Sequence, residues 1–315
     1  MTAAIYDVVV VGGGPGGLSA ALVLGRSRRK VVVIDEGNPR NSVTFKTHGY
    51  LTRDGIKPKE LRTIAKQQLT EYRNVSCIED VVEKVEQQGH TFNVWTQKGN
   101  MFQSRRVIMA TGMIEELPDI PGVRDVYGKS VFPCPYCDGW ERREEPLAVF
   151  GGEEKAVDFT KLIYNWSKDL IVFTNGTPRF DDCQKRELID YNILVVESPI
   201  TKLQSTKGKL EKVLVQSGEM FHRTGGFLVD TGEKQASAIP KDLGVPKNER
   251  GGYESDDHGL TGVEGLYVIG DAKNAFVGLA GAVGEGYEAG VVINHELVLE
   301  DWGQESDKRK NEPKV

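Results

Sequence analysis

The chain has 315 residues, of which 39% are hydrophobic and 27% charged, a composition typical of a soluble globular protein with room for two domains. The formal net charge of −6 argues against a nucleic-acid-binding surface, no apolar run reaches the length that spans a membrane, and the N-terminus lacks a signal-peptide pattern. Four cysteines, two of them solitary, do not make a secreted disulfide framework, so we expect a reducing, cytoplasmic environment.

The first forty residues carry the pattern of a dinucleotide-binding unit. A β-branched strand over 7–11 leads into Gly12, Gly14 and Gly17, and a helix and a second apolar strand follow, ending in Asp35. Glycines at this spacing allow a tight turn and the close approach of a pyrophosphate, whose charge the helix N-terminus stabilises. A carboxylate in the place of Asp35 accepts hydrogen bonds from a ribose. The alternative is a turn that only packs a helix on a strand, and the complete pattern argues against it.

The middle of the chain alternates between regular elements and polar loops. Loops over 36–41 and 48–55 are expected at the ligand end of the sheet, where His48 is more simply a structural loop residue than a ligand contact. The Pro- and Gly-containing stretch 118–122 indicates a domain boundary. The predicted elements are helices over 18–24, 58–69, 157–163 and 287–294, and strands over 31–34, 75–78, 81–85, 91–96, 106–112, 147–150, 170–173, 193–196, 213–215, 227–230 and 262–271.

Cys134 and Cys137 form a Cys-x-x-Cys motif that is followed at once by Asp138. Two sulfurs at this spacing meet across one tight turn, so the pair can cycle between dithiol and disulfide at little geometric cost. Half of a zinc site is the alternative. It is disfavoured because zinc needs four ligands, while Cys77 and Cys183 are isolated and no His-rich partner motif is present. Cys77 is interpreted as a small buried hydrophobic residue.

Residues 147–173 repeat the strand–turn–helix–strand pattern in a degraded form. Glu153 and Glu154 stand where a phosphate needs only N–H groups, so they would repel a pyrophosphate. The second strand is not followed by an arginine cluster that could clamp a 2′-phosphate. The cationic candidates are Arg179, Lys185 and Arg186, of which the last two fit a solvated helix face better. The pattern therefore predicts that NADPH binds poorly or not at all.

Four motifs in order resemble the low-molecular-weight thioredoxin reductases, which are flavin-dependent pyridine nucleotide-disulfide oxidoreductases. They are Gly12-x-Gly14-x-x-Gly17 with Asp35, Ala110-Thr111-Gly112, Cys134-x-x-Cys137-Asp138-Gly139, and Gly270-Asp271 before a helix. The resemblance covers about residues 5–298 and implies an α/β fold of two Rossmann-like three-layer domains. It implies an FAD-binding domain over 1–119 and 233–298, split by an inserted NAD(P)-binding-like domain over 120–232 that carries the cysteines. Residues 301–315 are expected to be a disordered tail.

The resemblance also implies a role for each matching residue. Cys137 would exchange electrons with the flavin, Cys134 would attack the disulfide of the partner, and Asp138 would protonate or activate a thiolate. The alternative for Asp138 is a helix N-cap. The Ala280–Val283 turn would approach the isoalloxazine ring, and no metal site is expected. The residues implied to bind FAD are Gly12, Gly14, Pro15, Gly17, Asp35, Glu36, Arg40, Asn41, His48, Ala110, Thr111, Gly112, Gly270, Asp271, Ala280 and Ala282.

Two features depart from the family pattern. The motif is Cys-Pro-Tyr-Cys, whereas ordinary members mostly have Ala-Thr between the cysteines. This motif resembles a branch that includes small-molecule dithiol oxidases, although those usually have His in the place of Asp138. The second departure is the weak nucleotide site. Relatives that have lost this site take electrons from another donor, such as reduced ferredoxin, or bind a second flavin there, so the donor stays open between NADPH, NADH and ferredoxin.

Three functions stay open on the sequence alone. The first is a thioredoxin reductase-like relay to the disulfide of a thioredoxin-like protein, and the second is a dithiol oxidase that passes electrons from a small dithiol to oxygen. The third is a flavin-bound sensor with little turnover, against which the intact Cys-x-x-Cys-Asp sequence argues. The resemblance implies a homodimer, and no nucleic-acid or membrane partner is expected.

Overall fold

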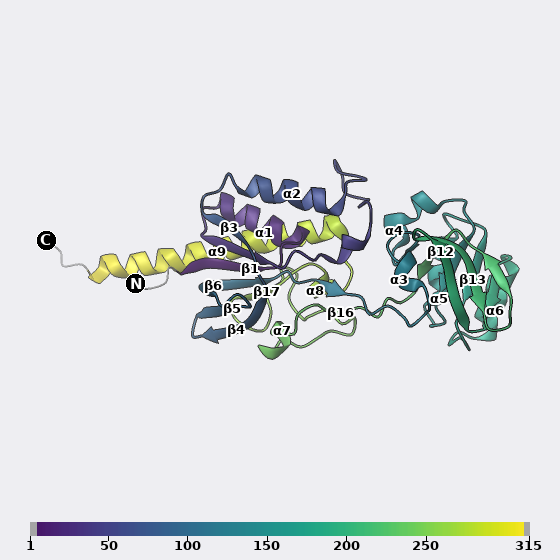
Figure 1. Ribbon diagram of the computed structural model, residues 1–315. Coiled ribbons are helices and arrows are strands. Elements are labelled where there is room, and N and C mark those ends of the chain that lie inside the picture. The colour runs from purple at the N-terminus through teal and green to yellow at the C-terminus, as the bar shows by residue number, and fades with distance from the viewer. Residues whose placement is uncertain (1–4, 312–315) are drawn as a thin grey trace. The chain divides into compact units, whose positions relative to one another are not determined.

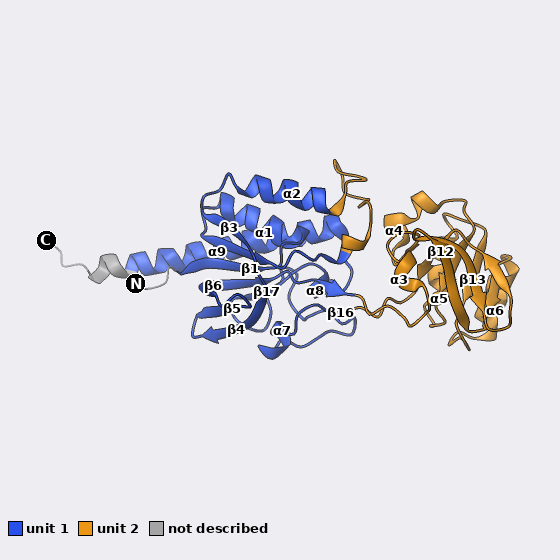
Figure 2. Cartoon of the chain, viewed as in Figure 1, with its two compact units in different colours: residues 1–40, 59–114, 234–315 blue, residues 41–58, 115–233 orange. Residues whose placement is uncertain are grey.

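A computed structural model describes residues 5–311, with side chains described over 5–306. The chain forms two compact units, shown in two colours in Figure 2: unit 1 comprises residues 1–40, 59–114 and 234–315, and unit 2 comprises 41–58 and 115–233. The predicted α/β class is confirmed. Within the described ranges, none of the helices has both the length and the apolar character needed to cross a bilayer.

The division into units differs from the expected domains at both boundaries and over residues 41–58, and the second boundary lies at 233–234 rather than 232–233. The first boundary lies at 114–115 rather than 119–120, because the linker packs with unit 2: Ile120 is buried in its core and the Leu203 N–H donates to the Pro121 carbonyl at 2.8 Å. Residues 41–58 also belong to unit 2. There, a Cβ on Gly128 would lie 2.7 Å from the Val43 side chain, so the two segments are in close contact.

Unit 1 is built on a mixed sheet in the strand order β3-β2-β1-β6-β5-β4, with β17 paired to β6. Strands β3, β2, β1, β6 and β17 run parallel, and β5 and β4 extend the sheet antiparallel. Its elements, most of which are labelled in Figure 1, are β1 (Tyr6–Val11), α1 (Pro15–Arg26), β2 (Val31–Asp35), α2 (Pro58–Leu69), β3 (Val75–Glu79), β4 (Val82–Gln88), β5 (Thr91–Thr96), β6 (Met101–Met109), β7 (Met113–Ile114), β16 (Lys234–Gln235), α7 (Ile239–Asp242), β17 (Leu266–Val268), α8 (Asp271–Asn274) and α9 (Gly278–Asn311). The 3-10 helix η1 (Arg40–Val43) crosses from unit 1 into unit 2.

Both faces of this sheet are covered, which is why its central strands are apolar without alternation. Val8 and Val10 of β1 pack with α1 and α9, while Val9 and Val11 pack with β5 and the segment that includes Tyr253. Strand β6 is longer than predicted because its first residues pair with β5 and its last three with β17. Cys77, expected to be buried, is exposed because β3 is an edge strand.

The C-terminal tail was wrongly expected to be disordered from residue 301. Helix α9 instead continues through Asn311, while residues 312–315 lie outside the described part of the chain. Ion pairs hold this stretch: Asp301 lies 2.6 Å from Arg29 Nη1 through Oδ2 and 2.8 Å from Arg105 Nη1 through Oδ1. The polar composition of this stretch predicted disorder, but ion pairs, rather than an apolar face, stabilise the helix there.

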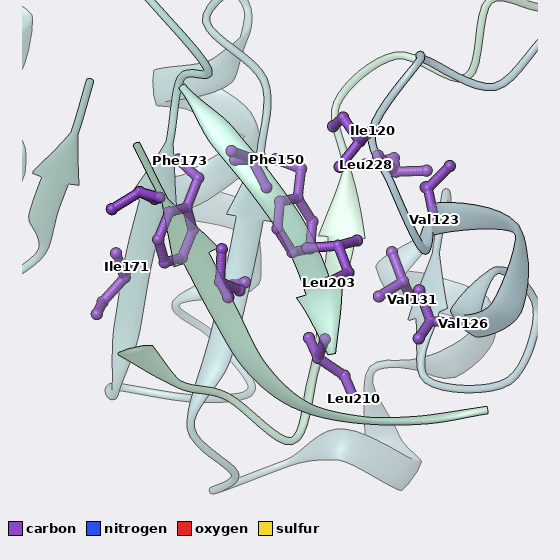
Figure 3. Packing of buried hydrophobic residues seen from close by; sticks show 14 of the residues in the cluster. Ile120, Val123, Val126, Val131, Phe150, Ile171, Phe173, Leu203, Leu210 and Leu228 are labelled. Atoms are coloured by element: carbon purple, nitrogen blue, oxygen red, sulfur yellow. The ribbon is translucent and has the colours of Figure 1, made fainter. Parts of the chain in front are cut away.

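Unit 2 contains a parallel sheet in the order β11-β10-β9-β15-β8 and an antiparallel sheet in the order β12-β13-β14. Phe150 of β9 and Phe173 of β10 stack with ring centres 5.8 Å apart in the core between them, shown in Figure 3. The elements are α3 (Val123–Val126), β8 (Val131–Phe132), α4 (Pro135–Asp138), η2 (Trp140–Arg142), β9 (Leu147–Phe150), α5 (Ala156–Ile163), β10 (Leu170–Phe173), α6 (Asp182–Asp190), β11 (Leu194–Val196), β12 (Ile200–Thr206), β13 (Lys209–Val215), β14 (Met220–His222) and β15 (Gly225–Leu228).

Candidate cofactor and dithiol sites

The glycine turn of unit 1 lies where the strand order reverses, between β1 and β6. Gly12 has a φ of +105°, and a Cβ there would lie 2.3 Å from the Ala110 carbonyl oxygen. A Cβ on Gly17 would lie 2.1 Å from the Gly12 carbonyl oxygen. Both positions therefore require glycine to bring the helix N-terminus against the two strand ends. Open parallel sheets bind ligands at such a reversal.

Asp35, at the end of β2, closes one side of this turn. Its Oδ1 accepts the Gly13 N–H at 3.0 Å, and its Oδ2 lies 2.6 Å from Arg62 Nη2 and 2.9 Å from Lys66 Nζ. Burial opposes ionisation of Asp35, but the Lys66 hydrogen bond, the Arg62 charge and the Gly13 N–H outweigh it and hold its pKa below the usual value. Asp35 is therefore a fixed carboxylate.

Arg62 and Lys66 are site residues that the sequence reasoning missed. They stand four residues apart on α2, hence on one face of the helix, and that face meets the end of β2. Arg62 also donates to the Gly13 carbonyl oxygen at 3.3 Å and to the Gly37 carbonyl oxygen at 3.2 Å. Two basic residues four positions apart could have indicated an anion-facing side of the helix. The sequence does not show, however, which side of α2 faces the end of β2.

The segment 270–282 packs against the same glycine turn. A Cβ on Gly16 would lie 3.0 Å from the Ala282 carbonyl oxygen, so the start of α9 lies directly against α1. Arg40 Nη1 is 2.9 Å from Asp271 Oδ2 and from the Ala275 carbonyl oxygen, which fixes the loop before α9. The expected Ala280–Val283 turn is wrong in form, since these residues are helical: α9 begins at Gly278.

The space around this turn fits a dinucleotide. Thr111 Oγ1 is buried and has no hydrogen-bond partner among the described residues, which marks a place for a polar ligand group. A Cβ at Gly14 or at Gly112 would meet nothing within 4 Å. The glycine turn is therefore tightly packed at Gly12 and Gly17, where α1 meets the strands, and has open space at Gly14 and Gly112, where a pyrophosphate would approach.

Two alanine variants separate folding from ligand binding at this turn. Gly17→Ala should lower the free energy of unfolding by about 1–3 kcal/mol because its Cβ overlaps the Gly12 carbonyl. Gly14→Ala, at a φ of −75° with open space around it, should leave unfolding unchanged but weaken FAD binding at least about tenfold. Thermal unfolding of the apoprotein and flavin fluorescence titration measure the two effects. Retention of FAD by Gly14→Ala at the affinity of the natural protein would contradict the placement.

The cysteine pair of unit 2 occupies one turn at the end of β8. Cys134 has extended backbone and precedes α4, and its carbonyl accepts the Cys137 N–H at 3.2 Å. Cys134 is 7% exposed and Cys137 is half-buried. Gly139 closes the turn tightly, because a Cβ there would lie 2.4 Å from the Pro135 carbonyl oxygen and 2.9 Å from the Trp166 ring. The chain thus holds the two sulfur-bearing residues on a rigid turn.

Asp138 is the titratable group next to this pair. Burial first, then the neighbouring Cys134, raises the pKa of Asp138 to about 7, while His48 and Arg142 act in the opposite direction. A carboxyl group that titrates near neutrality can both donate a proton to a leaving thiolate and take one from a thiol. The arrangement can therefore support thiol–disulfide exchange at neutral pH.

The second glycine turn, between β9 and α5, differs from the first. A Cβ on Gly151 would lie 2.6 Å from Glu153 Oε2, and that oxygen is buried without a hydrogen-bond partner among the residues described. The Arg179 N–H donates to the Gly152 carbonyl at 2.7 Å, so the loop after β10 lies against the turn. The glutamate that the sequence places in this nucleotide-binding pattern therefore occupies the turn itself, where a phosphate would otherwise bind.

The remaining predicted residues fall in three groups. The set that surrounds the first glycine turn includes Ala110, Thr111, Gly112, Gly270 and Ala282. Ala280 and Glu36 are exposed, and Pro15 is the first residue of α1. Asn41 and His48 were expected with the FAD-binding residues, but they lie in the segment 41–58, which belongs to unit 2.

Comparison with known proteins identifies the family of the chain. The family model described as "Pyridine nucleotide-disulphide oxidoreductase" matches residues 6–286. A "Probable thioredoxin reductase" of Arthroderma benhamiae is 33% identical over 301 residues, which covers 85% of this chain and 74% of the relative. The thioredoxin reductase of Bacillus subtilis is 25% identical over 301 residues, covering 92% of this chain and 94% of the relative.

A solved structure gives the same result for the fold. The crystal structure of "Putative Thioredoxin Reductase TrxB" from Bacillus anthracis has a TM-score of 0.90 and 38% identity, and the match covers 94% of this chain and 99% of that one. The relatives named here are thioredoxin reductases, which does not favour the small-molecule oxidase. The chain belongs to the pyridine nucleotide-disulphide oxidoreductase family and is a thioredoxin reductase-like, FAD-dependent oxidoreductase.

Proposed function

We propose that Cys134 and Cys137 carry an electron pair from FAD, held at the glycine turn of unit 1, to the disulfide of a thioredoxin-like protein. The observation that carries this proposal is the rigid cysteine turn with Asp138 beside it, whose pKa is raised to about 7 by burial and by Cys134. FAD, when bound, supplies the electron pair that returns the cysteines to the dithiol. The fit of FAD is supported by the open cradle at Gly14 and the buried Thr111 hydroxyl.

The exchange needs two thiolates and two protons. Cys134, as thiolate, attacks one sulfur of the partner disulfide, which forms a mixed disulfide and releases a partner thiolate that takes up a proton. Cys137 then attacks the Cys134 sulfur, so the pair leaves as a disulfide and the second partner sulfur leaves as a thiolate. Asp138 takes the proton of the attacking thiol and returns it to the leaving thiolate.

A single-turnover experiment tests this function. The holoenzyme is reduced anaerobically with dithionite, freed of excess reductant and mixed with an oxidised bacterial thioredoxin. The visible flavin absorbance should return in step with the appearance of thioredoxin thiols. Flavin that stays reduced would contradict the proposal. If a small dithiol reduces the flavin and oxygen reoxidises it faster than thioredoxin does, the oxidase would be favoured.

Asp138→Asn should slow this exchange about 100-fold and remove its pH dependence near neutrality. Below about pH 7 the carboxyl of Asp138 is protonated and can donate, and above that pH it can only accept, because its pKa is raised to about 7 by burial and by Cys134. Rates are measured across the neutral range with oxidised thioredoxin. Asp158→Asn, at an exposed carboxylate of α5, serves as the control and should leave the profile unchanged. If Asp138→Asn leaves the pH profile of the exchange rate unaltered, Asp138 does not transfer protons in this reaction.

We further propose that the electron donor is not NADPH. The Glu153 carboxylate lies over Gly151, where a pyrophosphate would need N–H groups, so the residues present do not fit this nucleotide. Lys185 is paired with Glu197, and Arg186 Nε donates to the Asp182 carbonyl at 3.1 Å, which leaves these two cations engaged within unit 2. A donor that places no phosphate in this turn, such as reduced ferredoxin, is compatible with the same residues.

The assembly and location are also proposals. Helix α9 exposes Tyr287, Val291, Val298, Leu299 and Trp302, an apolar surface that supports a homodimer. The exposed thiols of Cys77 and Cys183 suit a reducing cytoplasm, where they would not be oxidised.

A further inference from the structure

Arg62 and Lys66, on one face of α2, reach the carboxylate that closes the first glycine turn. Arg62 Nη2 lies 2.6 Å and Lys66 Nζ lies 2.9 Å from the same oxygen of Asp35, Oδ2. The other oxygen, Oδ1, accepts the Gly13 N–H at 3.0 Å. The side chains of Asp35 and Arg62 are 11% and 14% exposed, whereas that of Lys66 is 37% exposed. Two cations therefore meet one largely buried carboxylate, and one of them also reaches solvent.

These contacts decide what charge the turn presents to a ligand. A carboxylate beside a glycine turn repels a pyrophosphate, and Asp35 also engages the Gly13 N–H, which could otherwise donate to a phosphate. With Arg62 and Lys66 protonated, the three side chains together carry one net positive charge. The first turn of the described helix α1 holds no acidic residue. The first glycine turn is therefore cationic as well as open at Gly14.

The second glycine turn of the same chain has the opposite charge. Glu153 and Glu154 stand at that turn, and Glu153 Oε2 is buried with no hydrogen-bond partner in the part of the chain that the structure describes. Lys155, the adjacent cation, lies 3.4 Å from Asp230 and is engaged there. Two turns of similar backbone pattern thus differ in the sign of their charge, and the cations of the first turn come from a separate helix, α2.

Arg62 and Lys66 differ in what else they contact. Arg62 Nε donates to the Gly13 carbonyl at 3.3 Å and Arg62 Nη1 donates to the Gly37 carbonyl at 3.2 Å, so one guanidinium joins the turn, the loop after β2 and Asp35. Among the described residues, Lys66 donates to Asp35 and to neither of these carbonyls. Lys66 therefore contributes charge, whereas Arg62 contributes charge and backbone contacts.

We propose that Arg62 and Lys66 are cofactor-binding residues, which offset the charge of Asp35 and attract the pyrophosphate of FAD to the first glycine turn. This inference rests on the proposed placement of FAD at that turn. A carboxylate has about four acceptor positions, of which Gly13, Arg62 and Lys66 occupy three, so one position stays available for a ribose hydroxyl. Asp35 can thus bind the ribose while the two cations cancel its repulsion of the phosphates.

The test is the affinity of the apoprotein for FAD, measured by flavin fluorescence at low and at high ionic strength. Lys66→Gln and Arg62→Gln should each weaken FAD binding about five- to tenfold at low ionic strength, and the double variant should weaken it about 30-fold or more. Because the lost interaction is electrostatic, the loss should shrink at high ionic strength. Arg73→Gln, at an exposed arginine just after α2, is the control and should bind FAD as the natural protein does.

Two further measurements separate a charge effect from a structural one. Arg62→Lys keeps the charge but loses the planar fork that meets the Gly13 and Gly37 carbonyls, so it should recover most of the affinity that Arg62→Gln loses. Thermal unfolding of each apoprotein shows whether the variant is folded, and Lys66→Gln, at the more exposed cation, carries the test if Arg62→Gln does not fold. An unchanged affinity in Lys66→Gln, or a loss that is equal at both ionic strengths, overturns the inference.

Gly14→Ala distinguishes failure of this inference from failure of the FAD placement. If Gly14→Ala weakens FAD binding and Lys66→Gln does not, FAD lies at the turn but the cations do not hold it. If neither variant weakens binding, FAD is not held at this turn. Electron transfer takes no part in the measurement, so the role of Cys134 and Cys137 is tested separately by the single-turnover experiment.

Discussion

Replacement of either Cys134 or Cys137 by Ser is expected to lower turnover with oxidised thioredoxin by at least about 10³-fold. The thiolate is the nucleophile in disulfide exchange, and a serine hydroxyl neither ionises near neutrality nor forms a disulfide. The loss should be the same for both single variants and for the double variant, because the two sulfurs act as one unit. Activity within about tenfold of the natural protein in either single variant would exclude the pair as the electron carrier. Cys183→Ser, at an exposed cysteine of α6, is the matched control.

The two single variants should nevertheless differ in what they accumulate. If Cys134 attacks the partner, then Cys137→Ser traps a mixed disulfide between Cys134 and thioredoxin, and Cys134→Ser does not. Non-reducing electrophoresis and mass spectrometry of the adduct identify the linked cysteine. Within unit 2, Cys134 is 7% exposed and Cys137 is half-buried, so exposure alone would assign the attack to Cys137. The reverse trapping pattern would exchange the two roles while leaving the proposed function intact.

The sequence predicted best the parts of the chain where local pattern and tertiary packing agree. The apolar strands of residues 147–150 and 170–173 and the helix of 58–69 have the predicted limits, since buried parallel strands are apolar throughout and Pro58 suits the first turn of a helix. The glycine turn with Asp35 was predicted with its neighbours Ala110 and Gly270. Ala110 follows β6, which pairs with β1, so the strand order brings it against the glycine turn.

What the sequence did not predict depends on contacts between distant segments. Arg62 and Lys66 reach Asp35 only because of how α2 rotates on the sheet. His48 was expected with the FAD-binding residues, yet the segment 41–58 belongs to unit 2, and no local pattern records that assignment. Asp301 lies in a polar stretch, and its helix is held by Arg29 and Arg105, which are far away in the sequence.

NADPH is expected to leave the flavin of the natural protein oxidised, at any concentration at which thioredoxin reductases ordinarily use it. The Glu153 carboxylate lies over Gly151, and two unit charges 4 Å apart repel by about 4 kcal/mol at an effective dielectric constant of about 20. A penalty of that size weakens binding about 10³-fold. Stopped-flow absorbance of the holoenzyme measures flavin reduction, and calorimetric titration of the protein with the nucleotide measures binding directly. Rapid bleaching by micromolar NADPH would show that Glu153 moves aside and that the site is functional.

Two substitutions at Glu153 separate charge from occlusion. Glu153→Gln removes the charge and keeps the side chain, whereas Glu153→Gly also clears the space over the turn, so the second should gain more affinity, by about 100-fold or more over the natural protein. Glu154→Gln, at an exposed neighbour, is the control and should gain little, because solvent screens its charge. NADH and NADPH should gain alike, since Lys185 and Arg186 are engaged within unit 2. If the Glu153→Gly variant prefers NADPH to NADH, the exposed Arg179 would be assigned to bind the 2′-phosphate. If Glu154→Gln gains as much nucleotide affinity as the Glu153 variants, the negative charge of the whole region, and not the buried carboxylate, would be what excludes the nucleotide.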